Sequence, residues 1–298
     1  MALLVKLVVI TVAEPWAEKK IRAALNAKNS DYIVEIEHVH IFIFSGSIEL
    51  EAIKLYSKQD TGTNHHLYGE IAGIKFAGIS RLKALFRNDF DIREIFITDS
   101  KIRGTLPPRK QEKKPPLVSP VNVRIGKIQV DNLDLAVKNS GSSKSFLLKN
   151  ANLKLHEVQV LKKDTLSAGI AEKLDFNFGE LFLISPDSLY SLTLKDIDYD
   201  GTTAILSADS FLVQPNYKDY DFTARHKFET DRIDGKLVNI AVLDFSVADY
   251  LKSGDLKIAY LEIEKMDLDV FRDKRKIIPS FTKPTFQQLI YGYPGLLN

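Results

Sequence analysis

The fold of this chain is decided by residues 14–56, EPWAEKKIRAALNAKNSDYIVEIEHVHIFIFSGSIELEAIKLY. Glu14 and Pro15 suit a helix start, because proline tolerates the first turn and an acidic side chain complements the helix dipole. Apolar and polar residues alternate over 32–44, which is typical of a strand with one buried face. Residues 45–47 predict a turn and 48–56 predict the returning strand. A short helix followed by a long β-hairpin is therefore expected.

The alternation over 32–44 changes phase in the middle of the predicted strand. Val34 and Ile36 alternate with glutamates at odd positions, whereas the aliphatic residues that follow, Val39, Ile41 and Ile43, stand at odd positions themselves. A shift of one residue turns every following side chain to the other face of a sheet. We therefore expect a β-bulge or a local twist near Glu37 and His38.

The rest of the chain repeats the strand half of this segment. Further strands are predicted over 67–76, 90–102, 121–137, 146–160, 174–184, 190–199, 203–214, 221–230, 236–245 and 256–271. Short helices are predicted only at 79–86 and 247–251. Many long alternating strands with almost no helix between them predict a mainly β fold, an antiparallel sheet with one apolar face.

Composition excludes several classes of protein. The 298 residues include 41 basic and 39 acidic side chains, so the net charge is only +2, without the basic excess that a nucleic-acid partner requires. There is no cysteine, which excludes disulfides, thiolate metal sites and cysteine nucleophiles. Residues 106–120, LPPRKQEKKPPLVSP, predict a mobile loop rather than a domain boundary.

The first residues are hydrophobic but few. Residues 2–13, ALLVKLVVITVA, fall short of the about 20 apolar residues of a membrane span. Residues 1–13 are interpreted as the end of a membrane anchor or a signal-like segment, and a buried strand or helix turn is the alternative. Trp16, Lys19 and Lys20 follow directly and predict a membrane interface, with an amphipathic helix packed on the sheet as the alternative.

No motif assigns catalysis, and the chain is predicted not to be an enzyme and to use no cofactor. Asp196 to Gly201 imitates the start of a calcium loop, but its twelfth position is Ser207 where a bidentate glutamate is needed. A hairpin turn at Asp200 and Gly201 is the better explanation. His38 and His40 share one strand face without a third metal ligand, so solvent-facing histidines are expected.

Short basic runs usually face water. The cluster at 272–276, RDKRK, is therefore interpreted as a solvated turn, and contact with a phospholipid head group is the alternative.

Several segments together resemble one family. They are the hydrophobic start, PWAEKKIRAAL with YIVEIEHVHIFIFSGSIELEAIKLY, ISRLKALFRNDFDIREIFITDSKI, and LKIAYLEIEKMDLDVFRDKRKIIP with its proline-containing tail. This arrangement is similar to the AsmA-like, TamB-related family of bacterial envelope proteins. The resemblance implies a long, curved, taco-like β-sheet that forms an open groove in the periplasm, anchored to the inner membrane of a Gram-negative bacterium through the N-terminus. It implies non-enzymatic phospholipid transport between inner and outer membranes, supporting outer-membrane integrity.

The expected domains are the anchor segment 1–13, a β-groove domain 14–276 and a truncated tail 277–298. The predicted lipid-binding positions are apolar strand residues: Val34, Ile36, Val39, Ile41, Ile43, Ile48, Leu50, Ile95, Ile97, Ile128, Val130, Leu192, Leu194, Leu261 and Ile263. In a closed β-sandwich, acting as a binding or scaffold module without lipid transport, the same residues would fill the core. Phospholipids are the expected partners, and an envelope protein could pair with a sheet edge.

Overall fold

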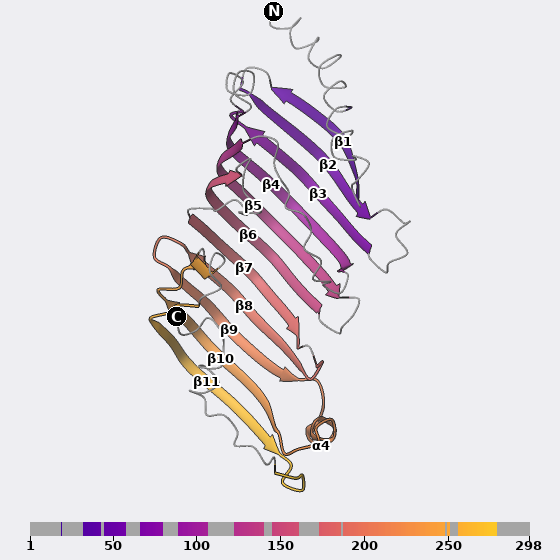
Figure 1. Cartoon of the computed structure of the whole chain (residues 1–298), viewed down its shortest axis with the longest axis vertical. Helices are drawn as coiled ribbons and strands as arrows, with labels where there is room; N and C mark the ends of the chain where they lie inside the picture. The colour runs from indigo at the N-terminus through magenta and orange to yellow at the C-terminus, as the bar shows by residue number, and fades with distance from the viewer. Residues whose placement is uncertain are drawn as a thin grey trace, which may run out of the picture. The chain divides into compact units, whose positions relative to one another are not determined.

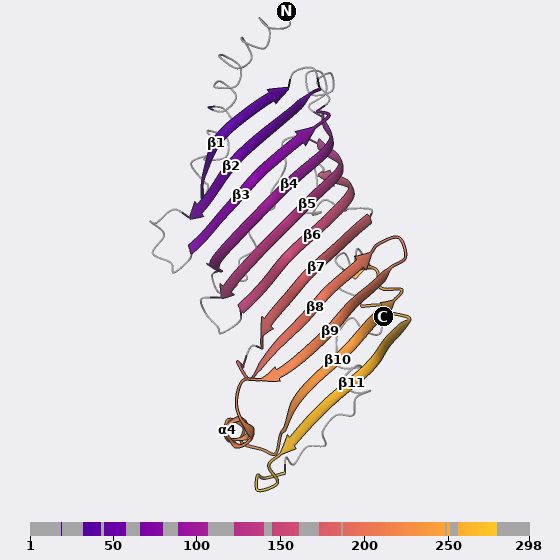
Figure 2. The same cartoon turned by 180° about the vertical axis from the view of Figure 1, so that it is seen from behind.

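A computed structural model describes residues 19, 32–42, 45–57, 66–79, 89–106, 122–139, 145–160, 173–185, 187–247, 249–250 and 256–278. The strands and the named helix occur in chain order as β1 (Tyr32–Phe42), β2 (Ser47–Ser57), β3 (His66–Ala77), β4 (Asp89–Leu106), β5 (Asn122–Asn139), β6 (Ser145–Val160), β7 (Lys173–Ile184), β8 (Tyr190–Asp200), β9 (Ile205–Pro215), α4 (Asp219–Ala224), β10 (Asp231–Leu243) and β11 (Tyr260–Arg272). Figure 1 and Figure 2 show these elements from opposite sides. The predicted helices at the N-terminus and at 79–86 fall outside the described residues, apart from helical Lys19 and the non-helical Ile79.

The strands form one eleven-stranded sheet whose order follows the sequence, and the sheet is not closed. The predicted mainly β, mostly antiparallel fold is confirmed. The described strands therefore belong to one sheet and not to the two stacked sheets of a sandwich. One pair differs from the prediction, because β4 and β5 run parallel. Parallel neighbours need a crossover of about a dozen residues or more, and residues 107–121 supply a connection of that length.

The chain divides into two compact units, which are described separately. Unit 1 comprises Met1–Gly141 with Lys149–Leu174, and unit 2 comprises Ser142–Leu148 with Asp175–Asn298. In unit 1, β1 to β5 lie side by side in sequence order (Figure 1). In unit 2, β8 to β11 do the same, and α4 lies in the connection from β9 to β10 (Figure 2).

The phase change predicted in the first strand is present, but it is not a bulge. Ile36 faces Ile53 and His38 faces Glu51, so the strands stay matched one to one across it. Glu37 and His38 are both exposed between the buried Ile36 and Val39, which shows that the strand changes its facing there. A bulge would place two residues opposite one, and no residue is inserted.

The change of facing continues from strand to strand as a line, here called the facing line. Its positions follow from the registers: Glu37, Ala52, Ala72, Asp99 and Asn132 in unit 1, and Gly179, Asp196, Asp209, Asn239 and Glu264 in unit 2. Half of these residues have a left-handed backbone, with φ between 47° and 57°: Ala52, Asp99, Asn132, Asp196 and Asn239. Asparagine and aspartate tolerate this conformation best among non-glycine residues.

The strand predicted over 221–230 is wrong, because the segment opens with helix α4 instead. Asp219 and Asp221 stand in the first turn of α4, where acidic side chains complement the helix dipole. Phe222 is 1% exposed and packs edge-on against the ring of Tyr190, with centroids 5.3 Å apart. Burial of this one aromatic ring therefore fixes a single helical turn where the sequence alternates like a strand.

Candidate functional site

The candidate site in unit 1 is one face of the sheet, on which apolar side chains line up across five strands. Directly paired residues form four rows: Val34–Leu55–Gly69–Ile102–Leu135, Ile36–Ile53–Ile71–Ser100–Leu133, Val39–Leu50–Ile74–Ile97–Val130 and Ile41–Ile48–Phe76–Ile95–Ile128. We call this set the apolar face of unit 1. Because the facing line lies between the second and third rows, all four rows share one side of the sheet.

Burial falls off across this face. Ile36, Val39, Leu50 and Ile53 form a buried cluster on β1 and β2, whereas the row members on β3, β4 and β5 are half-buried, apart from the buried Gly69 and Ser100. The hydroxyl of Ser100 has no hydrogen-bond partner among the residues that the structure describes. The accessible part of the apolar face therefore lies on β3 to β5, and the β1–β2 end is already packed.

Unit 2 repeats the arrangement over five more strands. Its rows are Phe176–Tyr199–Leu206–Val242–Leu261, Phe178–Ile197–Ala208–Ile240–Ile263, Leu181–Leu194–Phe211–Leu237–Met266 and Leu183–Leu192–Val213–Gly235–Leu268. This set is the apolar face of unit 2. Aromatic rings stack at the β7 end of this face. The ring centroid of Phe176 lies 4.6 Å from that of Phe178 and 5.1 Å from that of Tyr199.

The apolar face of unit 2 is open at β11. Leu261, Met266 and Leu268 are 56%, 59% and 50% exposed, although Leu261 belongs to the same row as the buried Tyr199. Burial thus depends on the place of the strand in the sheet, and the outermost described strand keeps its apolar residues accessible.

The opposite face of unit 1 is polar and held by ion pairs. Lys75 lies 2.6 Å from Glu49 on the neighbouring strand, and Lys54 lies 3.6 Å from Glu37. The Tyr56 hydroxyl donates a hydrogen bond to Glu35, and this bond raises the pKa of Tyr56. The sheet is therefore amphipathic, with apolar rows on one side and solvated charges on the other.

The predicted lipid-binding residues fall on these two faces wherever they are described. Unit 1 holds Val34, Ile36, Val39, Ile41, Ile48, Leu50, Ile95, Ile97, Ile128 and Val130, and unit 2 holds Leu192, Leu194, Leu261 and Ile263. Ile43, Trp16 and Lys20 lie outside the described residues, and Lys19 is helical and exposed. None of the helical residues that the structure describes belongs to a helix with the length and apolar character of a membrane span.

Sequence reasoning missed the contributions of β3 and β7. Ile71, Ile74 and Phe76 pack against the buried cluster, and Phe176 and Phe178 start the rows of unit 2. Glycines interrupt the β3 alternation, and β7 ends in a continuous apolar run over 181–184 that hides which face is buried. The signal that finds them is the cross-strand partner, which only the register supplies.

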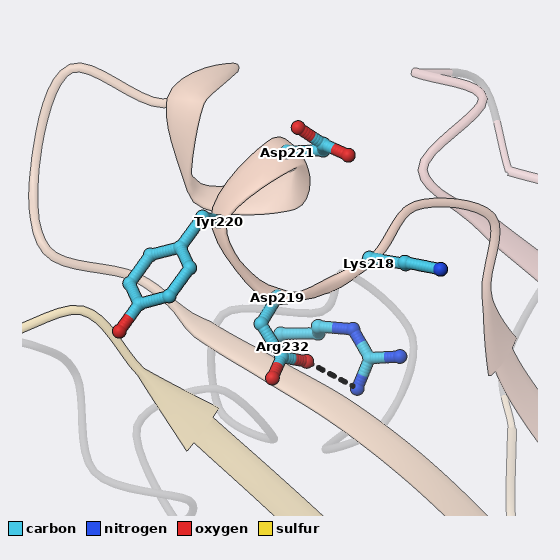
Figure 3. Close-up of a pocket in the computed structure, with 5 residues that line it drawn as sticks. All are labelled: Lys218, Asp219, Tyr220, Asp221 and Arg232. Atoms are coloured by element: carbon cyan, nitrogen blue, oxygen red, sulfur yellow. Dashed lines mark ion pairs between the residues drawn. The ribbon is translucent and has the colours of Figure 1, made fainter.

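A polar cleft of roughly 500 Å³ lies beside α4, lined by Lys218, Asp219, Tyr220, Asp221 and Arg232. The Arg232 guanidinium lies 3.6 Å from Asp219, its Nε donates to the Tyr217 carbonyl at 3.0 Å, and its side chain is only 12% exposed. Figure 3 shows that Lys218 and Asp221 point away from this pair. The ion pair of Arg232 and Asp219 attaches α4 to β10, and the charges that line the cleft do not converge on a reacting centre.

A second polar contact joins α4 to the end of β11. Arg275 binds Asp273 with two nitrogens, at 2.8 and 2.9 Å, and the Thr223 hydroxyl lies 3.4 Å from the same carboxylate. The hydrogen bond from Arg275 is the largest cause that lowers the pKa of Asp273 to about 2. The Arg275 guanidinium also lies 4.3 Å from the ring centroid of Tyr220, so this cluster stabilises the fold.

The remaining candidates from the sequence have structural roles. The Asp200 carboxylate accepts hydrogen bonds from the backbone of Thr202 and Thr203, which confirms the hairpin turn. His40 lies on the polar face with its Nε2 3.9 Å from Glu51. Within the described ranges, no group of three or more histidine or acidic side chains could hold a metal ion.

Most of the basic cluster after β11 is bound within the fold. Arg272 forms an ion pair with Asp231, and Lys276 donates to the His226 carbonyl at 2.7 Å. Together with the Arg275–Asp273 pair, these contacts favour a turn over a head-group site, although the turn is held by contacts within the fold and is not simply solvated as the sequence predicted.

No protein-family model matches the chain, and no curated protein sequence matches it. The functional argument therefore rests on the sheet and its two apolar faces.

Proposed function

We propose that this chain is a non-enzymatic protein of the bacterial cell envelope whose apolar sheet faces bind the acyl chains of phospholipids. In this proposal it conducts phospholipid between the inner and outer membranes and so supports outer-membrane integrity. The observation that carries the proposal is the pair of apolar faces, each with four rows running across five strands.

The chemistry of acyl chains fits such a surface. Each methylene exposed to water costs about 0.8 kcal/mol, so a chain with about 15 methylenes gains about 12 kcal/mol when it is fully covered. Rows that run from strand to strand give a chain apolar contacts at every position along its path. Such binding needs no specific polar residue, which agrees with the absence of a catalytic motif in the sequence.

The proposal also covers the protein family and the location in the cell. The resemblance to AsmA-like, TamB-related proteins supports a periplasmic protein anchored to the inner membrane, with the sheet curved into a groove that encloses the acyl chains. Trp16, Lys19 and Lys20 would then lie at the membrane interface. Unit 1 and unit 2 would each provide one stretch of the lipid path.

A scaffold or binding module of the envelope without lipid transport is the second candidate. The buried cluster of Ile36, Val39, Leu50 and Ile53 favours it, because these side chains already have partners and present no surface to a ligand. Under this candidate, the apolar faces serve only packing.

Lipid analysis of the purified protein separates the two candidates. Phospholipid extracted from the protein and identified by mass spectrometry is expected for the wild type, and a severalfold smaller amount for Leu194→Gln on the apolar face. Thr193→Gln is the matched control. Thr193 precedes Leu194 in β8, is also half-buried and belongs to the opposite face. Wild-type protein without lipid, or equal losses in the two variants, would contradict lipid binding.

A further inference from the structure

Strand β11 is the outermost described strand on one side of the sheet. It pairs with β10 from Tyr260 to Arg272, and it has no other neighbour among the described strands. The outer edge of such a strand presents backbone N–H and C=O groups that can pair with another chain. Native edges are commonly protected by charged side chains, by proline or by short length; β11 has charged side chains, but it is 13 residues long and has no proline.

The apolar side of β11 is the second observation. Leu261, Met266, Leu268 and Val270 are each at least half exposed, and they continue the apolar rows of unit 2 or extend them. Contiguous exposed apolar residues commonly mark an interaction site. A strand added beside β11 would cover part of this surface.

The polar side of β11 is acidic. Glu262, Asp267 and Asp269 stand on it with a single lysine, Lys265, by their places in the register. Asp267 lies opposite Lys236 of β10, but Asp269 lies directly opposite Asp234, so two like charges face each other at this end of the strand. Like charges in directly opposed positions destabilise a strand pair, and a basic neighbour on the outer side of β11 would relieve the repulsion.

The charges argue against a second copy of the same strand. An antiparallel pair of two β11 strands that keeps both apolar sides together sets Leu261 against Val270 and Ile263 against Leu268. That register also sets Glu262 against Asp269 and Glu264 against Asp267, so acidic residues oppose each other at these positions, and it sets Lys265 against the apolar Met266. A parallel pair in register opposes identical charges as well.

We propose that β11 is a docking edge for an extended segment of another polypeptide in which apolar residues alternate with lysine or arginine. The segment adds a twelfth strand about 4.8 Å beyond β11. Its apolar residues lie beside Leu261 and Leu268, and its basic residues lie beside Glu262, Asp267 and Asp269. The proposal does not depend on lipid binding, because backbone pairing and charge define the site.

Two synthetic peptides of the length of β11 test this edge. Both carry the same alternating valines and isoleucines, one with lysine and the other with glutamate at the polar positions. The lysine peptide is expected to bind the full chain about tenfold more tightly than the glutamate peptide and to slow amide hydrogen exchange in β11. Equal affinities, or protection confined to other strands, would overturn the proposal.

Charge reversal gives the matched control. The double variant Asp267→Lys with Asp269→Lys is expected to prefer the glutamate peptide. The control, Asp198→Lys with Asp209→Lys, makes the same change of net charge at exposed positions of β8 and β9, which have strands on both sides, and is expected to keep the wild-type preference. Equal loss of preference in both variants would show a general charge effect and reject the edge. Self-association of the wild type through β11 would also reject it.

Discussion

Asp273 shows how one carboxylate joins a helix to the end of a strand. Its side chain is 7% exposed and receives hydrogen bonds from Arg275 and Thr223. The folded protein therefore favours the ionised carboxylate, and its pKa is lowered from 3.8 to about 2. A lowered pKa contributes stability above the unfolded value, and this contribution is lost as the pH falls through the folded one.

The first prediction concerns this pH dependence. The melting temperature of the wild type is expected to fall between about pH 4 and pH 2 as the Asp273 carboxylate is protonated. Asp273→Asn is expected to melt lower at pH 7 and to lose less on acidification. Thermal unfolding followed by circular dichroism at both pH values measures this. A variant with the wild-type pH dependence would show that Asp273 does not carry the effect.

The second prediction separates packed from accessible apolar residues. Ile36 is 1% exposed, so Ile36→Ala is expected to destabilise the protein by about 2–5 kcal/mol through lost burial and a cavity. Leu261 is 56% exposed, so Leu261→Ala is expected to change the free energy of unfolding by about 0.5 kcal/mol or less. Denaturant titration measures both, and similar costs would contradict the assignment of β11 as an open edge.

Ile36 and Leu261 also show how far the alternation of apolar and polar residues can predict burial. The pattern of the sequence places Ile36 and Leu261 in the same class, as apolar residues on the apolar side of a strand. It does not predict their difference in burial, because burial depends on the neighbours of the strand. Those neighbours are set by pairing between distant segments.

At the scale of strands, the facing line is the feature that keeps the apolar residues of each strand on the same side of the sheet. The sequence predicts the change of facing in the first strand, and the structure shows it without an inserted residue. Side chains connect its positions on neighbouring strands: the Asn132 amide donates to Asp99 at 2.6 Å, and the Asn239 amide donates to Glu264. The line is therefore a coordinated feature of many strands.

The third prediction tests the left-handed backbone on this line. Ala52 has a φ of 52°, a conformation that costs a residue with a Cβ about 1–2 kcal/mol. Ala52→Gly is therefore expected to stabilise the protein by about 0.5 kcal/mol, after the entropy cost of glycine is subtracted. Ala241→Gly on β10, whose φ is not positive, is the control and is expected to destabilise by about 0.5–1 kcal/mol. Equal signs for the two substitutions in chemical denaturation would contradict the strain at Ala52.

Two elements escaped prediction for physical reasons. Alternation in 221–230 resembles a strand, but α4 forms because its acidic first turn and the buried Phe222 outweigh strand propensity. The parallel pairing of β4 and β5 depends on the path of residues 107–121, and composition identifies a loop there without giving its path. Pairing direction is a tertiary property that no local pattern contains.

At the scale of the whole chain, sequence reasoning predicted a mainly β, mostly antiparallel sheet with one apolar side, because that outcome needs only the period of the strands. The division into two compact units was not predicted, since strand patterning continues through both. The AsmA-like assignment and lipid transport remain proposals. They rest on the apolar faces and on the resemblance of segments at both ends of the chain.

The measurement that tests lipid conduction most directly is photo-crosslinking in the living cell at matched neighbouring positions. A photoreactive phenylalanine analogue is placed at Ile97 or Leu194 on the apolar faces, and at Thr98 or Thr193 on the opposite side. Mass spectrometry of the irradiated protein is expected to find phospholipid adducts at the first two positions and none at the other two. Adducts at neither pair, or equal yields on both sides, would contradict a lipid path along the apolar faces.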